Sequence, residues 1–278
     1  MGKTQYLLHF DSTDMKDFTK NGNIRVASNI KKFGNSLYLD GSSWMSLNCS
    51  KLDLINCDWS MDWWGYIEGT TGFGGAMIGD SVGVGFAPFT IRGTYNSSSS
   101  SVQMCSYFHG SDLDGAWNIY SDNYYGSMTV SMRAWHHFYI GVIDKQKVYV
   151  AIDGVIQKEI NHTSSKVGNL TGSDKELRIG RVETDGTQYF VGYIDEFRIV
   201  KGTCKWTTNF TPPIRAYSEE IGNLNHQGRN KQTVSMYDEK QSTVDIVTMT
   251  DRIAYIGADN TSGIATVHKN KIVYMNES

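Results

Sequence analysis

The stretch from residue 117 to residue 125 combines the two kinds of side chain that sugar binding requires. Aromatic rings stack on the apolar face of a sugar ring, and amide and carboxylate groups hydrogen-bond its hydroxyls. The stretch supplies both kinds, which predicts a glycan-binding surface formed by Trp117, Asn118, Tyr120, Asp122, Asn123 and Tyr124. The alternative for each aromatic residue is a place in the hydrophobic core.

A second pair of aromatic residues, Trp64 and Tyr66, lies in the segment 60–68, whose residues alternate in the manner of a β-strand. Successive strand residues point to opposite faces, so Trp64 and Tyr66 share one face and the other large apolar residues share the opposite one. This shared face is a candidate ligand-binding face, with burial in the core as the alternative for each ring.

Acidic residues could supply hydrolytic chemistry. Cleavage of a glycosidic bond requires two carboxyl groups that flank it, roughly 5 Å apart in retaining enzymes. The nearest acidic pairs are Asp112 with Asp114 and Asp195 with Glu196. We expect such pairs to lie in a loop or to point to different faces of a strand. The sequence therefore favours binding without catalysis, and a glycoside hydrolase whose carboxylates converge from separate strands is the alternative.

Two adjacent histidines, His136 and His137, have the chemistry of metal ligands. Neighbouring residues of a strand point to opposite faces, so the two imidazoles cannot readily chelate one ion. We expect one of them to be buried and the other not.

The composition restricts the class of partner. The net charge is -3 and the 26 lysine and arginine residues are scattered, so the positive field that nucleic-acid binding requires is missing. No apolar run approaches the roughly 20 residues that span a bilayer, which argues against membrane insertion. The start of the chain lacks the basic and apolar segments of a secretory signal, so we expect synthesis in the cytoplasm.

These candidate residues must be positioned by β-strands. From Thr4 to Val200, short runs of β-branched and aromatic residues alternate with clusters of Gly, Asn, Asp and Ser, and no helical period is evident. About twelve strands are predicted. The clearest element is a hairpin over residues 147–156, in which Asp153 and Gly154 form the tight turn. The predicted fold class is all-β.

The composition changes after residue 213. Pro212 and Pro213 end strand pairing, and residues 215–231 are polar and rich in turn residues. Beyond them the sequence alternates with a period of two, which predicts a small β meander. We therefore expect a sandwich domain over residues 1–213 and a small assembly or anchoring region over residues 214–278, through which copies of the chain form a homo-oligomer.

Four segments carry a family resemblance over about residues 5–213. They read LLHFD at 7–11, FGNSLYLDG at 33–41, WHHFYI at 135–140 followed by VYVAIDG at 148–154, and LRIG at 177–180 leading to FVGYIDEFRI at 190–199. In order and spacing the chain resembles the laminin-G-like members of the concanavalin A-like lectin and glucanase fold. The resemblance implies a jelly-roll sandwich of two large curved antiparallel sheets, whose concave face and loops bind glycans in many members.

The same resemblance implies a calcium ion, because this fold often binds Ca²⁺ through carboxylate and backbone oxygens. Asp11, after the first strand, and Asp195, in the last long strand, are the implied ligands. The alternative is that Asp11 begins a turn and that Asp195 accepts backbone hydrogen bonds.

The segment 201–213, KGTCKWTTNFTPP, resembles the tail that follows this domain in many bacteriophage virion proteins. The resemblance implies a virion component that is made in the host cytoplasm, binds a host cell-surface glycan and contacts other virion proteins. A purely structural fibre or decoration protein, in which the fold serves assembly, is the alternative.

Overall fold

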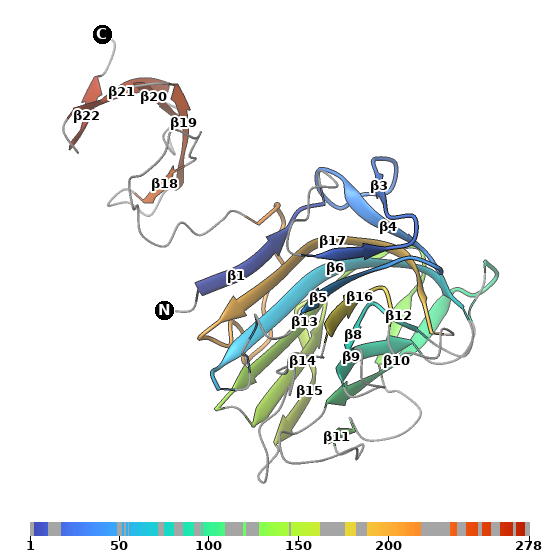
Figure 1. The fold of residues 1–278 in the computed structure, drawn as a ribbon. Coiled ribbons are helices and arrows are strands. Elements are labelled where there is room, and N and C mark those ends of the chain that lie inside the picture. Colours follow the sequence, from blue (N-terminus) through green and yellow to red (C-terminus); the bar gives the residue numbers. More distant parts are fainter. Residues whose placement is uncertain are drawn as a thin grey trace. The chain divides into compact units, whose positions relative to one another are not determined.

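The computed structural model describes most of residues 3–217 and five strands nearer the C-terminus (Figure 1). The described residues are 3–10, 18–48, 52, 54, 56–71, 75–80, 86–91, 95, 97–108, 119–120, 128–144, 146–161, 176–181, 188–217, 234–237, 243–249, 252–256, 262–268 and 271–275. They belong to two compact units, residues 1–220 and residues 221–278, and each unit is described by itself. Every regular element in these ranges is a β-strand, which confirms the all-β prediction. Within the same ranges there is no apolar helix of the length that crossing a membrane would require.

The largest sheet of the first unit has eight antiparallel strands. Seven of them follow the order β15-β14-β13-β6-β17-β4-β3, and β1 pairs with β17. The strands are β1 (Lys3–Leu8), β3 (Arg25–Ala27), β4 (Ser36–Asp40), β6 (Trp59–Thr70), β13 (Trp135–Ile143), β14 (Lys147–Ile152), β15 (Val155–Asn161) and β17 (Phe190–Lys201). The two longest strands, β6 and β17, lie side by side at the centre of the sheet.

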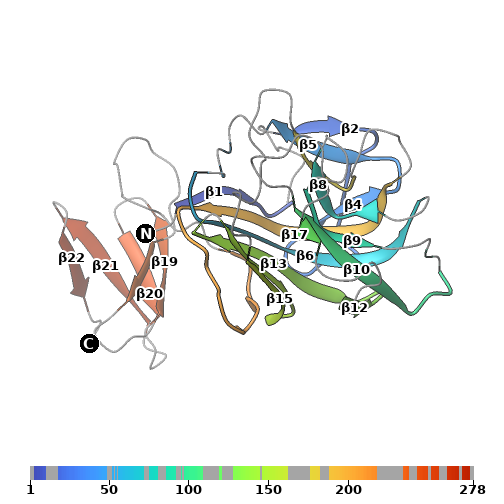
Figure 2. The same ribbon diagram turned by 90° about the horizontal axis from the view of Figure 1, so that it is seen from below.

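Two smaller sheets cover one face of the large sheet (Figure 2). One has the order β11-β10-β9-β7, with β12 against β10, and the other has the order β2-β5-β16-β8. A continuous hydrophobic core joins all three sheets, so the unit is an antiparallel jelly-roll sandwich, as predicted. The strands of the smaller sheets are β2 (Thr19–Asn21), β5 (Trp44–Asn48), β7 (Gly75–Ala76), β8 (Ile78–Asp80), β9 (Phe86–Ile91), β10 (Ser101–Phe108), β11 (Ile119–Tyr120), β12 (Met128–Ser131) and β16 (Glu176–Ile179).

Alternation along β6 decides which face each side chain occupies. Met61, Trp63 and Ile67 are fully buried in the core between the sheets. Their neighbours Trp64 and Tyr66 point to the opposite face of the large sheet, which we call the outer face. The predicted division of this strand between two faces is confirmed.

The hairpin of β14 and β15 turns at Asp153 and Gly154, as predicted. Both residues have positive φ, 52° and 78°, which a two-residue hairpin turn of type I′ requires. Phe210 donates its backbone N–H to the carbonyl of Gly154 over 2.8 Å, and a side chain at Gly154 would collide with the carbonyl of Phe210. The turn therefore holds residues 202–217, which we call the strap, close against the hairpin.

The predicted domain boundary at residue 213 falls within the strap. Tyr217 lies beyond that boundary, yet it is only 7% exposed and packs on the outer face of the large sheet. The first compact unit accordingly extends to residue 220. Strand pairing already ends at Lys201, and the two prolines do not end packing by side chains.

The described residues of the second unit form a five-stranded antiparallel sheet with the strands in sequence order, which confirms the predicted meander. Its strands are β18 (Val234–Tyr237), β19 (Thr243–Met249), β20 (Arg252–Ile256), β21 (Ser262–His268) and β22 (Lys271–Met275). Sequence reasoning predicts four of these strands and misses β18.

Candidate functional site

A row of aromatic residues crosses the outer face of the large sheet. Strand pairing places Trp135 of β13 opposite Tyr66 of β6, Tyr66 opposite Tyr193 of β17, and Tyr193 opposite Tyr38 of β4. We call these four residues the aromatic row. Arg25 of β3 lies opposite Tyr38 and ends the row. Neighbouring strands are about 4.8 Å apart, so the distance from Trp135 to Arg25 is roughly 19 Å.

Each ring of the aromatic row contacts the next. The ring centroids are 5.6 Å apart for Trp135 and Tyr66, 5.7 Å for Tyr66 and Tyr193, and 4.9 Å for Tyr193 and Tyr38. Tyr193 is 7% exposed, whereas the other three residues are only partly buried. Cross-strand aromatic pairs stabilise a sheet by roughly 0.2–1 kcal/mol each. Here they also hold partly exposed rings in fixed positions on one surface.

An open hollow of about 430 Å³ lies at the β3 end of the aromatic row. The guanidinium of Arg25 lies 4.7 Å from the centre of the Tyr38 ring, in cation–π contact. The hollow combines aromatic faces with hydroxyl, amide and cationic groups, which is the mixture that sugar recognition requires. Its lining is Arg25, Val26, Ala27, Ser28, Asn29, Tyr38 and Tyr193.

A carboxyl group and a phenol complete the polar chemistry of the row. Burial raises the pKa of Glu68, and the positive charge of Arg133 opposes that rise. Burial and the nearby charge of Glu68 raise the pKa of the Tyr193 hydroxyl. Tyr193 therefore stays protonated at neutral pH and can donate a hydrogen bond, while Glu68 can accept one.

Trp64 does not belong to this open surface, which differs from the expectation of an exposed ring on the binding face. The residue is 6% exposed. Lys32 places its Nζ 3.7 Å from the centre of the indole, and the rings of Phe33 and His137 pack against it at 6.2 and 5.1 Å. A loop from a distant part of the chain covers Trp64, and strand alternation cannot reveal such a cover.

Asp195 fixes the loop that covers Trp64. Its Oδ2 accepts hydrogen bonds from the backbone N–H groups of Lys32 and Phe33 over 3.1 and 2.9 Å, and its Oδ1 accepts one from Glu196 over 2.8 Å. Asp195 thus accepts backbone hydrogen bonds, which is the alternative to calcium binding given for this residue. Burial, opposed by the Phe33 N–H, raises the pKa of Asp195 to about 7.

The calcium site stays a prediction. Of its two implied ligands, Asp195 is fully buried and Asp11 lies outside the described residues. In the ranges that the structure describes, no group of three or more His, Cys, Asp and Glu side chains is arranged to hold a metal ion.

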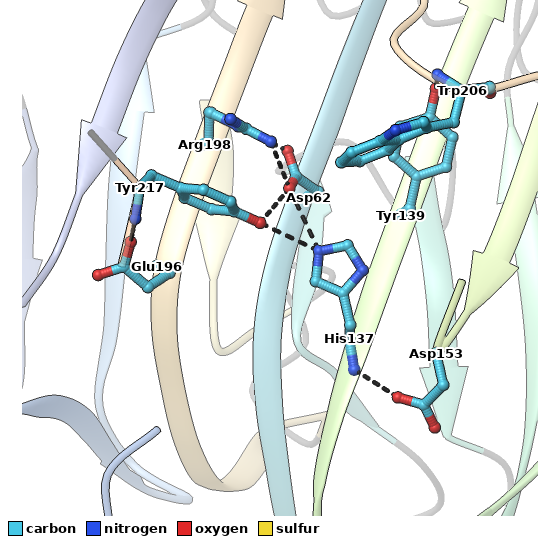
Figure 3. Close-up of polar contacts among 8 residues, drawn as sticks. All are labelled: Asp62, His137, Tyr139, Asp153, Glu196, Arg198, Trp206 and Tyr217. Atoms are coloured by element: carbon cyan, nitrogen blue, oxygen red, sulfur yellow. Dashed lines mark hydrogen bonds and ion pairs between the residues drawn. The ribbon is translucent and has the colours of Figure 1, made fainter. Parts of the chain in front are cut away.

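A buried polar cluster lies farther along the same strands, beneath the strap (Figure 3). Arg198 donates from Nε and Nη2 to the two oxygens of Asp62 over 3.0 and 2.9 Å. The Tyr217 hydroxyl also donates to Asp62, and Nε2 of His137 lies 3.3 Å from the same carboxylate. Burial opposes ionisation of Asp62, but the hydrogen bond from His137 and the charge of Arg198 hold its pKa below the usual range. His137 is fully buried and His136 is not, as predicted.

Tyr217 fastens the strap to this cluster. Its backbone N–H donates to Oε2 of Glu196 over 2.6 Å, and its ring lies 3.7 Å from the guanidinium of Arg198. Trp206 and Phe210 of the strap stack on each other at 4.0 Å and lie over the neighbouring part of β13. The cluster is closed to solvent, its charges pair with one another, and through Tyr217 it holds the strap.

A third arrangement links Ser131, His136 and Asp153. Ser131 Oγ lies 2.9 Å from His136 Nε2, and Asp153 Oδ2 lies 2.6 Å from His136 Nδ1. This connectivity is that of a serine-hydrolase triad. The two backbone N–H groups that follow the serine donate to carbonyls of other segments, so neither is available as an oxyanion-hole donor.

The stretch predicted from its composition to bind sugar lies largely outside the described residues. Tyr120 is described only through the backbone of β11, where it pairs with Tyr107. The binding role of this stretch stays a prediction. The members that fall outside the described residues are Trp117, Asn118, Asp122, Asn123 and Tyr124.

Sequence reasoning finds Tyr66 but misses the rest of the row. Tyr38 lies between Leu37 and Leu39, and this alternation is a signal that could have placed it on the outer face. The pairing of strands distant in sequence brings the row together, and no local pattern contains that information.

Comparison with known families agrees with this architecture. Residues 39–207 match the family Laminin_G_3 of the concanavalin A-like lectin/glucanases superfamily. The match extends from β4 into the strap and covers more than half of the chain. The chain therefore belongs to this family, which confirms the laminin-G-like resemblance.

Solved structures resemble the chain at low sequence identity. Domain 4 of AbnA, a GH43 extracellular arabinanase from Geobacillus stearothermophilus, in complex with arabinotriose, is 20% identical with a TM-score of 0.49, over 73% of this chain and 94% of that one. The binding domain of Paraclostridial Mosquitocidal Protein 1 is 9% identical with a TM-score of 0.46, over 99% and 74%. The CBM2 module of the Lactobacillus casei BL23 phage J-1 evolved Dit is 9% identical with a TM-score of 0.40, over 74% and 98%. No curated protein sequence matches the chain.

Proposed function

We propose that the first unit is a carbohydrate-binding module that holds an extended glycan along the aromatic row. The observation that carries this proposal is the register of four adjacent strands, which aligns Trp135, Tyr66, Tyr193 and Tyr38 on one face. Sugar rings can stack through their apolar faces on the three partly exposed rings, those of Trp135, Tyr66 and Tyr38. The hollow beside Tyr38 receives one end of the glycan.

Hydrogen bonds orient the sugar on this platform. Glu68 acts electrostatically on the Tyr193 hydroxyl of the row, and Ser28 and Asn29 line the hollow at its end. Ligand sites commonly combine a mostly apolar surface with a few polar groups that fix orientation. The rings contact one another before any ligand is bound, so little side-chain entropy is lost on binding.

The proposal assigns binding without catalysis. Of the two acidic pairs singled out in the sequence, Asp112 and Asp114 lie outside the described residues. Asp195 and Glu196 are both at most 1% exposed, and each accepts hydrogen bonds from the protein. Such carboxylates are not placed to flank a glycosidic bond. Ser131 lacks backbone donors from the two residues that follow it, which makes acyl transfer at that residue unfavourable.

We place the module on a bacteriophage particle, where it binds a host cell-surface glycan. This part of the proposal rests on the resemblance of the segment 201–213 to the tail of phage virion proteins. The second unit then serves assembly with further copies or with other virion proteins. The separate five-stranded sheet of that unit also favours the second candidate function, a purely structural virion component.

A glycan array tests the proposal. The full chain is compared with the variants Tyr66→Ala and Trp135→Ala, and we expect each variant to lose about tenfold or more in affinity, because one stacked aromatic contributes roughly 0.5–1.5 kcal/mol beyond the area that it buries. Ile156→Ala on β15, outside the row, is the control for loss of apolar surface. Measurements with calcium and with a chelator test the metal separately.

Two results would contradict the proposal. Absence of binding to any glycan would favour the structural virion component. If the row variants bind glycan as tightly as the unchanged protein, the glycan site lies outside the row, and the stretch 117–124 would be the next candidate.

A further inference from the structure

We propose that the glycan held by the aromatic row is anionic and that Arg25 binds its charged group. The inference rests on the proposed function and adds the chemical class of the ligand. Arg25 is exposed, lies at the end of the row, and lines the hollow in which a sugar that leaves Tyr38 would be placed. A guanidinium binds the oxygens of a carboxylate or phosphate in a planar, bidentate geometry.

The orientation of Arg25 is already set by the fold. Its guanidinium lies 4.7 Å from the centre of the Tyr38 ring, and its strand β3 pairs with β4 through Arg25 and Tyr38 themselves. A cation that rests on an aromatic face keeps its N–H groups at the edge of the guanidinium free for an anion. A sugar stacked beside Tyr38 would bring its substituents to that edge.

The nearby carboxylates are committed to other partners. Asp40, two residues from Tyr38 on β4, accepts three hydrogen bonds from Ser42 and Ser43. Asp195 is fully buried by the covering loop. Among the described residues, no carboxylate lies within ion-pair distance of Arg25.

The two ends of the row therefore differ in charge. The charge of Glu68, which also acts on the Tyr193 hydroxyl, is offset by the cation of Arg133. At the Tyr38 end, no carboxylate of the described residues forms an ion pair with Arg25, and the exposed Lys31 and the Lys32 ammonium lie in the next loop. A glycan with a negative group at the Tyr38 end fits this distribution, whereas a neutral glycan leaves Arg25 without an ionic partner.

The test uses matched pairs of oligosaccharides. Oligosaccharides that contain uronic acids are compared with the same compounds after reduction of the carboxylates to alcohols, and phosphate-bearing oligosaccharides with their dephosphorylated forms. Binding to the full chain is measured on an array and then by calorimetry. We expect a charged member to bind at least about tenfold more tightly than its neutral counterpart, with an advantage that shrinks as salt rises. The pair that shows this difference in affinity identifies the charged group of the glycan as a carboxylate or a phosphate.

Variants assign the effect to the residue. Arg25→Gln should remove the preference for the charged member, and Arg25→Lys should keep part of the preference. Lys158→Gln on β15, the opposite edge strand of the sheet, removes the same charge and should change neither affinity. Thermal unfolding confirms that each variant is folded.

The outcomes separate this inference from the proposed function. If neutral members bind as tightly as charged ones and Tyr66→Ala weakens both, the row binds glycan and the assignment of an anionic ligand is wrong. If Lys158→Gln acts as strongly as Arg25→Gln, the effect belongs to net charge and not to Arg25. If no glycan binds, both proposals fail.

Discussion

Removal of one hydroxyl group, in the variant Tyr217→Phe, should measurably loosen the strap. The hydroxyl donates to Asp62 and lies 3.0 Å from Nε2 of His137, in a site closed to solvent. Phenylalanine leaves a buried carboxylate without one of its donors. A hydrogen bond to a charged group contributes roughly 1.5–3 kcal/mol, and Arg198 remains to neutralise Asp62, so we expect a loss of about 2 kcal/mol in the free energy of unfolding.

Tyr217→Ala should cost more, because it also removes a ring that is 93% buried and stacked on Arg198. Truncation of a buried aromatic residue costs roughly 3–5 kcal/mol. In a unit of this size each kcal/mol lowers the melting temperature by about 2–4 °C. Shortened chains should show the same contribution of Tyr217. Residues 1–220, which keep Tyr217, should be as stable as the first unit in the full chain, and residues 1–213, which lack it, should be clearly less stable.

Tryptophan fluorescence during urea unfolding is the appropriate assay. All seven tryptophans precede residue 221, so the signal reports the first unit even in the full chain. Tyr66→Phe, which removes a hydroxyl from a partly exposed ring, is the matched control and should change stability little. The reasoning is refuted if Tyr217→Phe unfolds within about 0.5 kcal/mol of the unchanged protein, or if residues 1–213 match residues 1–220.

Two other predictions concern pH and assembly. Asp195 has a folded pKa of about 7, above its unfolded value of about 3.9, so between these values the folded state binds a proton that the unfolded state has lost. The free energy of unfolding should therefore fall as pH rises from 4 to 7, by at most about 4 kcal/mol. Asp195→Asn should reduce this dependence of the free energy of unfolding on pH, as measured by urea titrations. If the dependence is unchanged, other groups cause it. If the second unit drives assembly, light scattering should give a multiple of the chain mass for the full chain and the mass of a monomer for residues 1–220, and a monomeric full chain would contradict this expectation.

Much of the fold can be predicted from the sequence because its signals are local. Alternation assigns Trp63 to the core and Tyr66 to the outer face, and the Asp-Gly pair places the hairpin turn. The short strand that carries Arg25 has three residues and no alternating pattern of useful length, so it is missed. The cover over Trp64 is also missed, because it depends on a loop that Asp195 holds from another strand.

The candidate site could not be assembled from the sequence for the same reason. Tyr38, Tyr66 and Tyr193 come from three strands that are distant in the chain, and only the register of their pairing makes them neighbours. The strap is similar, because Tyr217 follows two prolines from which the sequence predicts a domain boundary. Its burial depends on Asp62 and Arg198, and these contacts are as remote in sequence as those of the row.

The route of the chain out of the sandwich also has a mechanical consequence. The strap continues directly from β17, which is paired with β6, β4 and β1. If the second unit is held on a support while the first unit grips a surface, tension along the chain reaches the contacts of Tyr217 first and then the stacked rings of Trp206 and Phe210. Only after these contacts break would the force act on β17, and pulling β17 out of the sheet breaks its hydrogen bonds with β6, β4 and β1 together. The side-chain contacts of the strap would thus absorb a pull before the sheet that carries the aromatic row is disturbed.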